Sequence, residues 1–382
     1  MTDASPSAAP NVSCSTTVEH DTSAALAIEE VTALEASVLT CPGWLDLNVP
    51  LRAERDAIRL SENLLAAEPE LDGPAADAAV RRLAEAVAVE GRLVNAPIYQ
   101  LLTIQAARGG LEGTVGVTEF VSYALTMDLL EAELIDAIAD GRSCLPGTLP
   151  LRDRFLPDTA AVLQLDTRLC AGGPLALCAI ARPGSRSRRG VPDYLLLVQE
   201  RRGSVLNAAR RLAVIPKAFH GPMSDPSDDA AIAATLEREL EEELFGRDDI
   251  DSTHQDQLRP DPMHPSLRAG PMRWLTEHAD DDQWTMECTG FGLNLVSGNF
   301  EFASLIVVED EEWWGRFGGS IQANWESAGL RSYSSLDRDL LGRLCQDPSW
   351  SNEGLFALLQ GFRHLTAREG HRANLPIIDV EV

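Results

Sequence analysis

The chain has 382 residues, a hydrophobic fraction of 45% and a mean hydropathy of −0.10, which is typical of a globular protein long enough for two domains. No apolar run reaches the length of a membrane span. The formal net charge of −27 argues against a nucleic-acid partner, because nucleic acids bind to clustered lysine and arginine. Residues 1–25 lack the basic and apolar regions of a signal peptide, so we expect a disordered tail and cytoplasmic localisation.

The segment that follows the tail is predicted to be a mostly α-helical domain over residues 26–145. Apolar residues recur there at three- and four-residue spacing within 26–39, 51–67, 75–89 and 118–139. An interaction or homodimerisation module is one interpretation of this domain. A lid that completes an active site is the other.

Glycines and prolines between residues 141 and 157 favour a boundary, and residues 150–382 are predicted to form a second domain that contains strands. The expected elements are a strand at 175–181, a buried strand at 193–200, a short strand at 212–216, a hairpin of 291–296 and 299–308, and two amphipathic helices at 336–344 and 353–365. Their order indicates an α/β sandwich rather than a parallel doubly wound sheet.

The most informative segment is the acidic run at residues 237–246. Asp225 and Pro226 form a good N-cap and N1 pair, and Gly246 is a plausible helix terminator, so one helix is expected between them. At about 100° per residue, Ile232, Leu236, Leu240 and Leu244 fall on one buried stripe.

The glutamates of this helix separate into two groups. Glu239, Glu242 and Glu243 lie on one flank of the apolar stripe, whereas Glu237 and Glu241 lie on the other. Like charges this close repel one another, and a hard cation such as Mg²⁺ or Mn²⁺ would offset the repulsion. A solvated acidic helix face is the alternative interpretation.

Arg238-Glu239-Leu240-x-Glu242-Glu243 resembles the R-E-U-x-E-E core of the Nudix box, whose full form is G-x5-E-x7-R-E-U-x-E-E-x-G-U. The match covers only the second half of the box. The box glutamate would fall on Ala230 and the box glycine on Ser224, and Phe245 stands where the terminal glycine belongs.

The resemblance implies a Nudix-type α/β/α sandwich with a mixed sheet. It also implies that Glu239, Glu242 and Glu243 bind Mg²⁺ or Mn²⁺ and that Arg238 orients a carboxylate. Nudix enzymes often take a general base from outside the box, for which Glu301 on the second hairpin strand is a candidate.

Three cationic residues are candidate substrate ligands. Arg201 and Arg202 directly follow the expected strand at 193–200, and Lys217, the only lysine of the chain, precedes the acidic helix. Each can contact a phosphate oxygen.

Three functions remain open at this point. The leading hypothesis is metal-dependent hydrolysis of a nucleoside diphosphate linked to another group. The second is a Nudix-type domain that binds a phosphorylated or nucleotide-like ligand without cleaving it. The third is a biosynthetic enzyme that reuses the same carboxylates. A long polar stretch between 247 and 287 would lie over the substrate, where Trp274 or Trp284 could stack on a base or simply pack.

Overall fold

The computed structural model of the protein describes residues 11–17, 32–51, 56–62, 71–89, 91, 93–185, 190–205, 207–247, 263–278, 282–368 and 371–381. Within the tail that was expected to be disordered, residues 11–17 form a strand. The other residues of the tail lie outside the described part of the chain.

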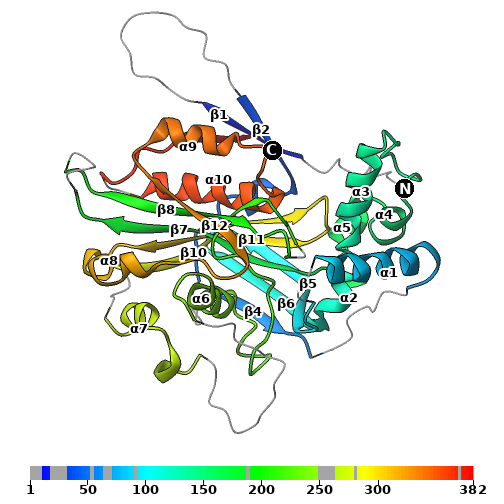
Figure 1. The fold of residues 1–382 in the computed structure, drawn as a ribbon, viewed down its shortest axis with the longest axis horizontal. Coiled ribbons are helices and arrows are strands. Elements are labelled where there is room, and N and C mark those ends of the chain that lie inside the picture. Colours follow the sequence, from blue (N-terminus) through cyan, green and yellow to red (C-terminus); the bar gives the residue numbers. More distant parts are fainter. Residues whose placement is uncertain are drawn as a thin grey trace, which may run out of the picture.

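A large mixed sheet forms the centre of the described fold (Figure 1). Its ten strands include eight in the order β12-β8-β7-β11-β10-β2-β1-β13, with β3 paired to β10 and β9 paired to β8. The bounds are β1 Asn11–Thr17, β2 Thr32–Leu39, β3 Val49–Pro50, β7 Gly172–Arg182, β8 Asp193–Arg201, β9 Leu212–Val214, β10 Trp284–Asn294, β11 Phe300–Val308, β12 Ser327–Ser334 and β13 Ile377–Glu381. β7 and β11 run parallel, while β7 and β8 are antiparallel, which makes the sheet mixed.

Helices cover both faces of this sheet. In β7, Leu175 and Leu177 belong to the core under α10 (Asn352–Ala367), whereas Ala176 and Cys178 belong to the core under α6 (Ile232–Glu243). Successive side chains of a strand point to opposite faces, so a strand buried on both sides reads as a continuous apolar run. Figure 1 shows α9 (Arg338–Cys345) and α10 on one face and α6 on the other.

The C-terminal expectations are confirmed. The buried strand at 193–200 is β8, the short strand at 212–216 contains β9, and β10 and β11 form the hairpin. The two closing helices are α9 and α10. On the α6 side the chain also forms α7 (Gly270–Glu277) and α8 (Glu311–Phe317).

The prediction of a mostly α-helical domain over residues 26–145 is not supported. Helices do occur there: α1 Gly73–Ala88, α2 Phe120–Ala124 and α3 Leu129–Ala139, followed just beyond it by α4 Pro150–Phe155 and α5 Thr159–Leu163. The same segment also contains β4 (Ala57–Leu60), β5 (Pro97–Ala107) and β6 (Gly110–Glu119), which form a three-stranded sheet.

Strand pairing overrides the helical spacing in these segments. Gly109 adopts a φ of +76° at the turn between β5 and β6, a conformation that glycine reaches without strain. Residues 57–60 carry helix-like spacing but pair in parallel with β6, and β2 pairs with β10. The segments expected to form two separate domains therefore contribute strands to one main sheet.

Helices α1 to α5 gather at one end of the molecule near β5 and β6 (Figure 1). Leu129 and Leu130 of α3 and Leu151 of α4 share the core that lies under α6. Among the described residues, no helix combines the length and apolar character needed to cross a membrane.

Candidate functional site

Helix α6 begins at Ile232, later than the Asp225-Pro226 pair predicts. Asp225 does accept a hydrogen bond, but from Ser227 N–H within a separate turn, and Ala231 is extended with ψ of 134°. The buried Asp56 carboxylate accepts the Ile232 N–H instead, so a distant segment satisfies the first turn of α6. Burial raises the pKa of Asp56 to about 6. The expected terminator is confirmed, because Gly246 follows the helix with a φ of +73°.

The predicted separation of the glutamates is confirmed. Glu241 is fully buried, accepts the Ala269 N–H at 2.8 Å and pairs with Arg247 at 2.7 Å. Glu237 lies 3.7 Å from Arg268. These two carboxylates are held by the segment that follows α6 and do not line the cavity on its other flank.

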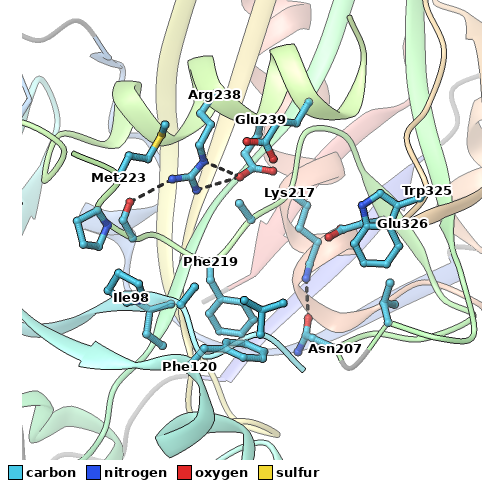
Figure 2. A pocket seen from close by; sticks show the side chains of 18 of the residues that line it. Ile98, Phe120, Asn207, Lys217, Phe219, Met223, Arg238, Glu239, Trp325 and Glu326 are labelled. Carbon is cyan, nitrogen blue, oxygen red and sulfur yellow. Dashed lines mark hydrogen bonds and ion pairs between the residues drawn. The ribbon is translucent and has the colours of Figure 1, made fainter. Parts of the chain in front are cut away.

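The other flank of α6 forms one wall of a cavity of about 310 Å³ (Figure 2). Its lining comes from five segments: Val94, Ala96, Pro97, Ile98 and Phe120; Arg201, Val205 and Asn207; Lys217, Ala218, Phe219, Gly221, Pro222 and Met223; Arg238, Glu239 and Glu242; and Trp325 and Glu326. Residues within 94–98 and Phe120, which precede the large mixed sheet's β7 in the chain, therefore contribute to the cavity wall.

Arg238 binds the carboxylate of its neighbour Glu239. Its Nε and Nη2 donate to the same oxygen of Glu239 at 3.1 and 2.9 Å, and its Nη1 donates to Gly221 O at 3.2 Å. Both side chains are about nine-tenths buried. The guanidinium therefore ties α6 to the loop before it and fixes Glu239 at the cavity wall.

Glu243 lies beneath this wall and is fully buried. One carboxylate oxygen accepts the Lys217 N–H at 2.8 Å, and the other lies 3.3 Å from Gln199 Nε2 and 3.7 Å from Arg201 Nη1. The protein itself thus occupies much of the hydrogen-bonding capacity of this carboxylate.

Sequence reasoning missed Glu326, which precedes β12 and lines the same cavity. Arg201 donates to it at 2.7 Å while also lying near Glu243. Arg201 therefore links two carboxylates from segments far apart in the chain. Isolated in a polar turn, Glu326 carries no local signal that could have identified it.

The structure separates the remaining candidates. The Nζ of Lys217 donates to Asn207 at 2.6 Å and lies 3.4 Å from Glu353 Oε1 at the cavity edge. Arg202 lines a different groove and donates to Ser327 O at 3.4 Å. Glu301 is buried beside a separate space of about 10 Å³ and does not line the main cavity.

Side chains close to the start of α6 hold the loop that precedes it. Asp229, next to the position of the absent box glutamate, accepts the N–H groups of Met223, Ser224 and Asp225 at 2.8 to 3.0 Å. His220 lies 2.9 Å from Ala230 O and 2.8 Å from Thr235 Oγ1. Because a carbonyl only accepts, Nε2 of His220 carries the proton and the neutral ring accepts from Thr235.

The two tryptophans of the long polar stretch pack elsewhere. Trp274 stacks on His278 and donates to Asp310 at 2.7 Å, and Trp284 is buried in β10. Residues 248–262 and 279–281 lie outside the described part of the chain. The tryptophan on the cavity wall is Trp325, adjacent to Glu326 (Figure 2).

Carboxylates crowd one another at this wall. Burial raises the pKa of Glu239, and the charge of Glu326 raises it further, against the lowering effect of Arg238. Burial likewise raises the pKa of Glu243 well above its usual range, with Glu239 and Glu326 adding to the rise and Arg201 opposing it.

The donor chemistry of this wall therefore fits a hard divalent cation, which prefers carboxylate oxygens and offsets their repulsion. In the geometry of the described residues, however, no three acidic, histidine or cysteine side chains form a group able to hold a metal ion. Of the three glutamates predicted to bind the cation, Glu239 and Glu242 line the cavity and Glu243 does not.

Neither the protein-family models nor the curated proteins compared with this chain include a match.

Proposed function

We propose that this chain is a Nudix-type hydrolase that cleaves the phosphoanhydride of a small diphosphate-containing molecule with the help of Mg²⁺ or Mn²⁺. One observation carries the proposal. Glu239, Glu242 and Glu326 line the same cavity as Arg201, Lys217 and Arg238, so acidic and cationic side chains meet around a space of ligand size. The helices on both faces of the mixed sheet support the Nudix-type sandwich.

Each side chain has a role in this proposal. Glu239 and Glu242 would hold the cation, and Arg238 keeps Glu239 in place. When bound, a divalent cation neutralises diphosphate charge and lowers the pKa of a coordinated water. Lys217, at the mouth of the altered loop, donates to a phosphate oxygen. Glu326, rather than Glu301, is the carboxylate from outside the box that reaches the cavity, and it accepts the proton of the attacking water.

A second candidate function is binding without cleavage, and the surroundings of Glu243 favour it. Its carboxylate already accepts the Lys217 N–H and lies near Gln199 and Arg201, so it has little capacity left for a cation. A cavity that holds a diphosphate through its cationic residues alone would serve as a sensor domain.

Product release separates the two candidates. The purified chain is incubated with a panel of diphosphate esters and nucleoside diphosphate derivatives, with Mg²⁺, with Mn²⁺ and with a chelator. The hydrolase predicts metal-dependent release of phosphate or a monophosphate. Saturable binding by calorimetry without product in either metal would instead establish the sensor. If the chain neither binds nor cleaves any compound of the panel, both candidate functions are rejected.

A further inference from the structure

The cavity is divided into a charged wall and an apolar floor (Figure 2). Arg238 and Glu239 of α6 and Glu326 lie on one side, and Ile98, Phe120 and Phe219 lie on the other. We therefore expect a ligand with one charged part and one apolar part, because each part of a bound molecule is stabilised by groups of matching polarity.

An aromatic cluster forms the floor. Phe120 and Phe219 meet edge to face with their ring centroids 5.2 Å apart, and Tyr123 lies 4.8 Å from Phe219. The hydroxyl of the fully buried Tyr123 accepts a hydrogen bond from Asn299 and faces away from the ligand space. Edge-to-face rings of this kind form a stable apolar surface.

Polar groups around the floor are largely engaged within the protein. Asn207 accepts from Lys217, Phe120 N–H donates to Ala96 O, and Ala218 N–H donates to Pro174 O. Pro97 and Pro222, which also line the cavity, have no N–H. The described floor thus offers few groups that could hydrogen-bond the polar edge of a nucleobase lying on it.

Burying the ring nitrogens and exocyclic groups of a nucleobase on such a surface leaves them without partners, which weakens binding. A hydrocarbon has no such groups and gains from leaving water. The cavity of about 310 Å³ is at the small end of ligand sites, which limits the size of the group.

We infer that the group attached to the diphosphate is a short hydrocarbon, aliphatic or aryl, and not the nucleoside that the family resemblance implies. The inference rests on the proposed function, since the charged wall must hold the diphosphate. The hydrocarbon lies on Phe120 and Phe219, and the diphosphate faces Lys217 and α6.

Four probes test the inference on the unaltered chain in Mg²⁺, with affinity measured by calorimetry: inorganic pyrophosphate, hexyl diphosphate, phenyl diphosphate and ADP. Both esters should bind at least about tenfold more tightly than pyrophosphate, because each buried methylene strengthens binding about fourfold. ADP should bind no more tightly than pyrophosphate.

Each other outcome has a definite meaning. If ADP binds more tightly than both esters, or if all four bind equally, the inference is overturned while the proposed function stands. If none of the four binds, the proposed function fails and this inference fails with it.

Variants of the floor provide the second measurement. Phe120→Ser should remove most of the advantage of hexyl diphosphate over pyrophosphate, and Phe120→Leu should preserve it. Pyrophosphate affinity should stay within about twofold in both variants, which also shows that each is folded. An unchanged ester advantage in Phe120→Ser would count against the inference.

Discussion

The two flanks of α6 carry the same residue type in opposite settings. Glu241 and Glu242 are adjacent in sequence and about 100° apart around the helix. Glu241 is fully buried against Arg247 and the Ala269 N–H, whereas Glu242 lines a cavity of about 310 Å³. One glutamate is therefore held by the segment that follows α6, and the other lines the cavity.

This difference shows that an acidic run has no single role. A carboxylate becomes structural when the next segment of the chain supplies a cation and an N–H group. It becomes available for chemistry when the facing segments leave a space. On α6 both happen within one helical turn, and substitutions on the two flanks should therefore change different properties.

The largest expected effect is on turnover. Glu242→Gln removes a cavity carboxylate while preserving its size, and should lower Mg²⁺-dependent hydrolysis about a thousandfold, equivalent to about 4 kcal/mol. Steady-state kinetics measure the loss. Circular dichroism and the thermal unfolding midpoint should remain close to those of the unaltered chain.

Glu237→Gln is the matched control on the opposite flank. The Glu237 side chain is also partly buried, lies 3.7 Å from Arg268 and does not line the cavity that Glu242 lines. Its turnover should stay within about twofold of the unaltered rate. Equal losses in the two variants, or full activity in Glu242→Gln, would contradict the assignment of the flanks.

The next effect concerns stability. Glu241→Ala leaves Arg247 and the Ala269 N–H without their buried partner, and should lower the free energy of unfolding by about 3 kcal/mol. Urea unfolding measures it. Turnover per folded molecule should be unchanged, and a stability loss below about 1 kcal/mol would show that the pair is not structural.

The smallest effect is a pH dependence on the cavity side of α6, where His220 joins the loop to Thr235. Burial lowers the pKa of His220 to about 3 from an ordinary value of 6.5. The folded state then binds this proton more weakly than the unfolded chain does. Above pH 6.5 the neutral His220 contributes fully to the free energy of unfolding. That contribution is lost as the pH falls towards 3, and the loss reaches about 2 kcal/mol at pH 5.

His220→Gln has no titrating ring and isolates this contribution. Between pH 7 and pH 5, the unaltered chain should lose about 2 kcal/mol more of its free energy of unfolding than the variant does. Urea unfolding at both pH values gives the difference. Equal losses would mean that His220 is not held neutral in the folded state.

Local pattern predicted the C-terminal fold well and the N-terminal fold poorly. The apolar run at 193–200 is confirmed as β8 because a strand buried on both faces must be apolar at successive positions. Residues 57–60 have helix-like spacing but form β4, because pairing with β6 outweighs a weak local preference.

The sequence by itself determined which side of α6 each glutamate occupies, since the helical period and the apolar stripe fix their angles. That the carboxylate held by Arg238 is Glu239 was decided by the folded structure. Only the tertiary structure decided that Glu326, Trp325 and Phe120 join that flank around one cavity, that Glu243 is engaged by Lys217 N–H, and that Glu301 lies outside. These outcomes depend on contacts between segments far apart in the chain, and local periodicity carries no information about which distant segments meet.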